Sequence, residues 1–180
     1  MSIHEIVLPE TKPETEWVRG RALQKMSPVF AHGLLQLRVG AALAAWASEG
    51  NHGRVATEWR FRVAPPNEIV RPLVPDVGYL AYEALGADAP DEDVAVPLHA
   101  PTVAVEILSP RDRRADVDHK TATYLAAGSA AVITVDPRQL TIAVYDTNGA
   151  RVLRDGDVLA HRALPGFTLG VRKLFEGMKR

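Results

Sequence analysis

Two short apolar runs in the middle of the chain each contain one carboxylate, and this feature constrains the fold most. The first is V-P-D-V-G-Y-L, with Asp76, and the second is T-V-A-V-E-I-L-S-P, with Glu106. Both runs predict strands. If the strands pair antiparallel, the start of the first lies opposite the end of the second, and the two carboxylates meet at one edge of the sheet. A lone carboxylate in such a run is costly to bury unless it is paired or binds a metal ion.

Upstream of these runs the sequence predicts a lead-in and a long helix. Residues 1–27 form an irregular segment, in which W-V-R-G-R-A-L is compatible with a short hairpin. Ser27 followed by Pro28 is a good helix start, because a capping hydroxyl precedes a proline at the first helical position. Apolar residues then recur at helical spacing to about Ser48, so we expect the helix to end there.

A further strand and a loop surround the Asp76 run. Residues 54–63 alternate imperfectly, which predicts a strand with Arg60 and Arg62 on one face. Residues 83–93 are acidic and rich in turn formers, and we expect a loop there.

After the Glu106 run the pattern changes to a helix and then to strands. Ser109 and Asp112 have the spacing of a capping box for the helix that carries Lys120. Residues 130–136 and 141–146 predict a hairpin, and the apolar tail packs back on the body. We therefore predict an α/β fold in which a mixed central sheet is flanked by helices.

Composition limits the classes of protein that remain. A chain of 180 residues fits one domain, residues 1–180. It has no cysteine, which excludes disulfides and thiolate metal sites and favours a cytoplasmic protein. The start lacks a secretory signal, and the longest apolar run is far shorter than the roughly 20 residues of a membrane span. A net charge of −1 argues against non-specific coating of nucleic acid, although a nuclease need only be locally basic.

The paired carboxylates predict a metal site, and a simpler interpretation stands beside it. Two hard oxygen ligands, completed by a backbone carbonyl and waters, suit Mg²⁺ or Mn²⁺. Lys120 is the best-placed ammonium to orient a water or stabilise the transition state. Alternatively, Asp76 caps a turn, Glu106 faces solvent, and Asp116 forms a surface i,i+4 ion pair with Lys120. Spacing alone leaves both interpretations open.

Other chemistry has less support in the sequence. The six histidines show no paired zinc spacing, and we expect His32 to be structural. No phosphate-binding glycine loop and no Gly-x-Ser-x-Gly elbow is found. Tyr124 is expected to pack in the core. A short basic cluster beside the Glu106 run could contact phosphates or be simply solvated; it consists of Arg111, Arg113 and Arg114.

A series of short motifs resembles a known family. In order these are P-D-V (75–77), V-E-I-L-S-P (105–110), D-x-x-x-K-x-x-x-Y (116–124), V-D-P (135–137) and L-P-G-F (164–167). Together they resemble the Uma-two family of endonucleases, which is assigned to the restriction-endonuclease-like fold with a PD-(D/E)xK type of site.

The resemblance implies phosphodiester hydrolysis with Asp76 and Glu106 as metal ligands. The Ile107 carbonyl then completes the inner shell. The superfamily's usual lysine lies two residues after the glutamate, where this chain has Leu108, and Lys120 on the following helix could replace it.

The leading hypothesis is therefore a Mg²⁺-dependent (or Mn²⁺-dependent) DNA endonuclease that acts as a homodimer, because a duplex has two strands. Glu58 is a further acidic candidate. The candidate phosphate contacts are Arg60, Arg62, Arg111, Arg113 and Arg114. Two alternatives remain: a non-enzymatic binding or assembly protein on the same scaffold, which Leu108 favours, and a hydrolase of another phosphorylated substrate.

Overall fold

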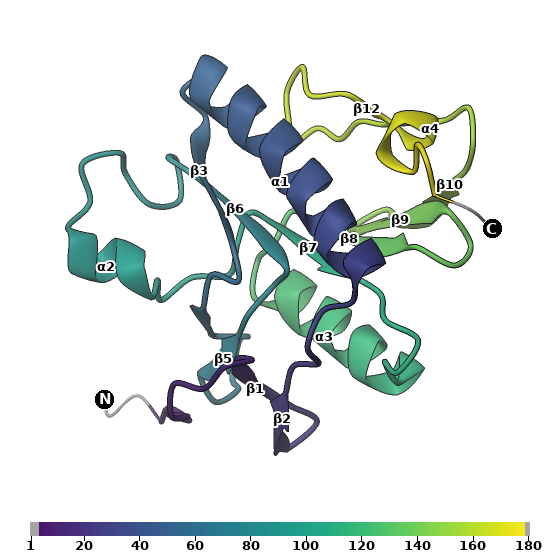
Figure 1. Ribbon diagram of the computed structural model, residues 1–180. Helices are drawn as coiled ribbons and strands as arrows, with labels where there is room; N and C mark the ends of the chain where they lie inside the picture. The colour runs from purple at the N-terminus through teal and green to yellow at the C-terminus, as the bar shows by residue number, and fades with distance from the viewer. Residues whose placement is uncertain (1–3, 179–180) are drawn as a thin grey trace.

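A mixed six-stranded sheet forms the centre of the computed structural model, which describes residues 4–178 (Figure 1). Its strand order is β10-β9-β8-β7-β6-β3, and only β7 and β8 run parallel. The strands are β3 (Gly53–Thr57), β6 (Val77–Ala81), β7 (Val103–Ile107), β8 (Ala131–Asp136), β9 (Thr141–Asp146) and β10 (Gly149–Leu153). The hairpin predicted from residues 130–136 and 141–146 is present as the antiparallel pair β8 and β9.

The two carboxylate runs pair antiparallel, as the sequence predicts. Val77 lies opposite Val105 in the register of β6 and β7. Continuing this register by one residue brings Asp76, just before β6, beside Glu106 near the end of β7. The sheet therefore places both carboxylates at one edge.

Two helices cover different faces of the sheet (Figure 1). α1 (Phe30–Glu49) packs with Val103, Val105 and Ile107 in one buried cluster. Ala104 belongs to a second cluster with Tyr124 of α3 (Arg114–Ala126). Because side chains alternate across a strand, Glu106 shares the α3 face with Ala104.

Smaller elements surround this core. β1 (Thr15–Val18) and β2 (Arg21–Gln24) form the hairpin that the lead-in allows, and β4 (Phe61–Val63) pairs with β5 (Arg71–Leu73). The remaining elements are α2 (Asp91–Ala95), β11 (Val158–Leu159), β12 (Leu169–Gly170) and α4 (Val171–Leu174). Within residues 4–178, no helix is long and apolar enough to cross a membrane.

The prediction of a single strand over residues 54–63 is wrong, because the segment forms two strands, β3 and β4. Glu58 adopts a left-handed φ of +52° between β3 and β4, and its N–H donates to the Asp76 carbonyl at 3.3 Å. The chain therefore leaves the central sheet at Glu58, and β4 pairs with β5 instead. The acidic loop over 83–93 contains the start of the short helix α2.

Both predicted helix starts are also wrong. α1 begins at Phe30 with Val29 as N-cap and no side-chain cap, so Ser27 does not cap it. In the second case the Ser109 N–H does donate to Asp112 Oδ2 at 2.6 Å, but α3 begins only at Arg114. The pair stabilises a turn ahead of the helix. In both places a segment without helix or strand precedes the helix, and these segments line the cavity described next.

Candidate active site

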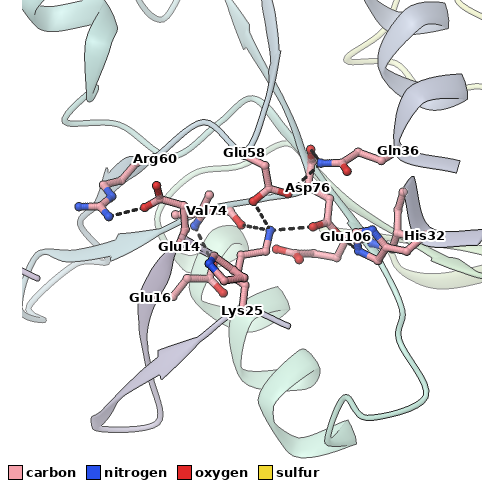
Figure 2. Close-up of polar contacts among 12 residues, drawn as sticks. Glu14, Glu16, Lys25, His32, Gln36, Glu58, Arg60, Val74, Asp76 and Glu106 are labelled. Carbon is pink, nitrogen blue, oxygen red and sulfur yellow. Dashed lines mark hydrogen bonds and ion pairs between the residues drawn. The ribbon is translucent and has the colours of Figure 1, made fainter. Parts of the chain in front are cut away.

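Asp76 is the centre of a buried polar network (Figure 2). Asp76 is only 2% exposed. Oδ1 accepts from the Lys25 ammonium at 2.7 Å, and Oδ2 accepts from the Ile107 N–H at 2.6 Å. The His32 Nε2 atom lies 3.2 Å from Oδ2. Burial by itself would raise the pKa of Asp76, but Lys25 and His32 outweigh it and hold the pKa far below its usual range, so the carboxylate is ionised.

Lys25 follows β2 directly, and its ammonium lies among three oxygens. Besides Asp76, it contacts Glu58 Oε2 at 3.0 Å and the Val74 carbonyl at 3.0 Å. Burial opposes the charged form of Lys25, but the surrounding carboxylates, Asp76 first among them, raise its pKa above the ordinary value. The side chain is therefore a buried cation.

A second lysine joins the remaining two carboxylates. The Lys120 ammonium is 2.7 Å from Glu106 Oε1 and 2.9 Å from the Glu16 carboxylate. Glu16 Oε1 also accepts from the Val74 N–H at 2.6 Å, which fixes the β1–β2 hairpin against the chain ahead of β6. The Tyr124 hydroxyl donates to Glu106 Oε1 over a long 3.4 Å. Glu106 is thus held from the α3 side of the sheet.

The network carries an excess of negative charge. It contains four carboxylates but only two lysines. Asp76 and Glu106 come from the paired strands, and Glu16 and Glu58 come from other segments. Burial, together with the charges of Asp76 and Glu16, outweighs Lys120 and raises the pKa of Glu106 to about 8. Glu106 therefore takes up a proton more readily than an ordinary glutamate does, and a further cation beside it would favour its ionised form.

A cavity of about 570 Å³ opens onto this network. Asp76, Glu106 and Lys120 all line it. Its walls come from the hairpin, from the exposed connection 26–29 that leads to α1, and from residues 107–113. Arg21, Arg111 and Arg113 also line it, so an acidic floor is combined with basic groups.

The predicted catalytic residues come together, and the surface alternative is wrong. Lys120 is only 8% exposed and pairs across the fold, not with Asp116. Asp116 instead accepts from Arg21 at 2.7 Å and from Arg19 at 3.4 Å. Glu106 does not face solvent, because Lys120 covers its carboxylate. Glu58, a further acidic candidate, also lies in the network through Lys25.

The predicted phosphate contacts divide into two groups. Arg111 and Arg113 line the cavity. Arg60 pairs with Glu14, and Arg62 forms a two-point ion pair with Glu5. Both of these arginines hold the N-terminal segment, and the structure does not bring them to the cavity. Arg114 pairs with Asp118 on the exposed side of α3, likewise outside the lining.

Four members of the network are not among the predicted site residues: Glu16, Lys25, His32 and Gln36. Lys25 and Asp76 are 51 residues apart, and Glu16 and Lys120 are 104 residues apart. His32 is expected to be structural, yet it contacts Asp76 and lines the cavity. The side-chain amide of Gln36, one turn further along α1, donates to Glu58 Oε1 at 2.8 Å and to the Asp76 carbonyl at 2.9 Å. Helical spacing from His32 is the only hint of its place.

The donor chemistry fits a divalent cation. Asp76 and Glu106 supply hard oxygen donors, which suit Mg²⁺ or Mn²⁺. The excess of carboxylates would be balanced by such an ion, as the raised pKa of Glu106 indicates. In the part of the chain that the structure describes, no three His, Asp or Glu side chains already converge as a ready-made metal cage. The fit therefore rests on donor type and charge.

A mixed sheet with flanking helices and a carboxylate pair at one edge defines the restriction-endonuclease-like class of fold. The chain belongs to the Uma2 family, described as "Putative restriction endonuclease", whose model matches residues 4–172. A crystal structure described as "a putative nuclease belonging to DUF820", from Anabaena variabilis ATCC 29413, is similar with a TM-score of 0.82. The identity is 24%, and the match covers 93% of each chain, which shows the fold. No curated protein matches the chain. The family and fold that the sequence motifs imply are thus confirmed.

Proposed function

We propose that this protein is a Mg²⁺-dependent (or Mn²⁺-dependent) endonuclease that hydrolyses phosphodiester bonds of DNA. The observation that carries the proposal is the antiparallel pairing of β6 with β7. Its register, continued by one residue, brings Asp76 beside Glu106, and both residues line the cavity. Membership of the Uma2 family supports the same class of activity.

Asp76 and Glu106 would hold the cation, with the Ile107 carbonyl as a third ligand. A bound divalent ion supplies a water of lowered pKa and neutralises charge on the phosphate. The Ile107 N–H fixes the Asp76 carboxylate through its 2.6 Å hydrogen bond, and His32 contacts the same oxygen. Asp76 is thus pre-oriented as a ligand before any ion arrives.

Lys120 takes the place of the lysine that the superfamily has at the position of Leu108. Its ammonium is already 2.7 Å from Glu106, so it stays close to any group that Glu106 binds. Because it is a buried cation, it can stabilise negative charge that develops on the phosphate or orient a water by hydrogen bonding. Its pKa is raised by Glu106 and Glu16 in spite of burial, which keeps it protonated.

Arg111 and Arg113 are the proposed phosphate contacts of this site. They line the cavity, while the acidic floor binds the cation. We further propose that the protein acts as a homodimer, because cleavage of both strands of a duplex requires two sites. DNA remains the proposed substrate even though the chain has a net charge of −1, because basic groups gather locally at the cavity.

The test is DNA cleavage with matched carboxylate variants. Supercoiled plasmid, linear duplex and single-stranded DNA are incubated with Mg²⁺ or Mn²⁺ and wild-type protein, Asp76→Asn or Glu106→Gln. Glu49→Gln, an exposed carboxylate at the end of α1, is the control. We expect cleavage by wild type and Glu49→Gln and its loss in both site variants. Folded protein that cuts none of these DNAs with either metal would contradict the proposal.

A hydrolase of another phosphorylated substrate is the second candidate. The cavity of about 570 Å³ falls within the range of small-molecule pockets, roughly 300–1,000 Å³. Metal-dependent release of phosphate from nucleotides or sugar phosphates, without cleavage of DNA, would favour it.

A further inference from the structure

The Lys25 ammonium occupies a three-oxygen cage that has the composition of a cation site. Its acceptors are Asp76 Oδ1 at 2.7 Å, Glu58 Oε2 at 3.0 Å and the Val74 carbonyl at 3.0 Å. An ammonium has three N–H bonds, so these three oxygens satisfy it completely. Two carboxylates and one backbone carbonyl are also the hard donors that divalent cations take in proteins. The cage differs from the Asp76–Glu106 pair, with which it shares one residue.

Hydrogen bonds that do not involve Lys25 hold the two carboxylates and the Val74 peptide that supply the cage oxygens. Gln36 donates to Glu58 Oε1 at 2.8 Å and to the Asp76 carbonyl at 2.9 Å. The Ile107 N–H holds Asp76 Oδ2, and the Val74 N–H donates to Glu16. Because these bonds do not involve Lys25, we expect both carboxylates and the Val74 peptide to stay in place when its ammonium leaves.

Lys25 itself is suited to leave. Its backbone N–H donates to the Glu14 carbonyl at 2.8 Å, so the main chain stays fixed while the side chain rotates. The following residues, 26–29, belong to no helix or strand and are exposed. The side chain lines the cavity of about 570 Å³, which gives the displaced ammonium room near the basic rim or a bound phosphate.

We propose that Asp76, Glu58 and the Val74 carbonyl form a divalent-cation site, in which the Lys25 ammonium is a tethered occupant that the cation displaces. The inference deepens the proposed function and rests on it for the purpose of the cation. Glu58 becomes a metal ligand, and Lys25 becomes the group that sets how tightly the cation binds. Neither role is evident from the sequence, because Glu58 lies in the turn between β3 and β4 and Lys25 is 51 residues from Asp76.

The test measures Mn²⁺ binding by calorimetry at fixed pH and salt, without DNA. Lys25→Met keeps the side-chain length and removes the competing charge. We expect it to tighten Mn²⁺ binding by about tenfold or more, because the variant removes a buried positive charge that repels the incoming cation at contact distance. Adding Glu58→Gln to Lys25→Met is expected to reverse that gain. Lys173→Met is the matched control: it makes the same substitution at an exposed lysine of α4 outside the cavity lining, and is expected to change affinity by less than about threefold.

Each outcome decides the inference. Unchanged or weaker Mn²⁺ binding by folded Lys25→Met would overturn it, and so would a gain that survives Glu58→Gln. If Lys25→Met does not fold by circular dichroism, Lys25→Gln, which keeps a hydrogen-bond donor for the cage, is measured against the same expectation. DNA cleavage by wild type with no gain in the Lys25 variants contradicts the inference and leaves the proposed function standing. Tighter, Glu58-dependent binding without any cleavage supports the inference and contradicts the proposed function.

Discussion

The Asp76 carboxylate and the Ile107 backbone amide are joined by a 2.6 Å hydrogen bond that links the start of β6 to the end of β7. The bond places the carboxylate of one strand beside the backbone that carries Glu106. Because Ile107 belongs to the main sheet, the orientation of Asp76 depends on rigid structure rather than on a loop. Such a pre-oriented ligand is what a metal site requires.

Asp76→Asn is expected to destabilise the protein moderately as well as to abolish metal binding. The amide oxygen still accepts from Ile107, but Lys25 loses one of its two carboxylates. Breaking a buried ion pair costs about 3–5 kcal/mol, and we expect about 1–3 kcal/mol here because Glu58 remains. Urea unfolding of both proteins without metal gives the difference. A variant as stable as wild type would show that the Lys25 contact contributes nothing to folding.

Lys120→Met is expected to destabilise the protein more strongly. It leaves Glu16 and Glu106 buried without their shared cation, and losses of about 3–5 kcal/mol follow when one partner of a buried pair is removed. Asp118→Asn, on the exposed face of the same helix, breaks only a surface pair with Arg114 and should cost less than about 1 kcal/mol. Thermal unfolding compares the two. An equal loss of stability in both variants would contradict the role of Lys120 as the shared cation of Glu16 and Glu106.

Local sequence patterns were sufficient to predict the two strands that bring Asp76 and Glu106 to one edge of the sheet. Both runs are apolar, the first beginning next to Pro75 and the second ending at Pro110, so both strands follow from residues that are close in sequence. Their antiparallel pairing was a hypothesis, and the register of β6 and β7 confirms it. The sequence also predicts the helix that carries Lys120, because the helical pattern is local as well. The motifs P-D-V and V-E-I-L-S-P, which helped to indicate the family that the comparison confirms, lie in these same two runs.

The rest of the site depends on packing between distant segments. Glu16 lies in β1 and Lys25 directly follows β2, and no local pattern specifies how this hairpin docks on the sheet. The break at Glu58 requires a left-handed φ at a residue other than glycine, and the alternating pattern of residues 54–63 continues across it. The sequence therefore predicted one long strand and could not place Glu58 next to Lys25.

Glu5→Gln is expected to lower stability at neutral pH and to leave it nearly unchanged in acid. The hydrogen bond from Arg62 lowers the pKa of Glu5 below the ordinary value of a glutamate, 4.5. A carboxylate with a lowered folded-state pKa adds stability above the unfolded pKa, and this stability is lost as pH falls through the folded pKa. Because the pair is partly exposed, the effect should be below about 1 kcal/mol. Unfolding at pH 7 and pH 3 tests it: an equal difference at both values would contradict the ion-pair origin.

Arg113→Ala and Arg62→Ala should affect DNA binding differently. Arg113 lines the cavity, whereas Arg62 is held by Glu5 at the N-terminal segment. Each lost phosphate contact reduces the slope of log affinity against log salt by about 0.9 on duplex DNA. We expect this reduction for Arg113→Ala and an unchanged slope for Arg62→Ala, measured by fluorescence anisotropy with Ca²⁺ in place of Mg²⁺. A reduced slope in the Arg62 variant alone would move the DNA path from the cavity to the β4 side of the molecule.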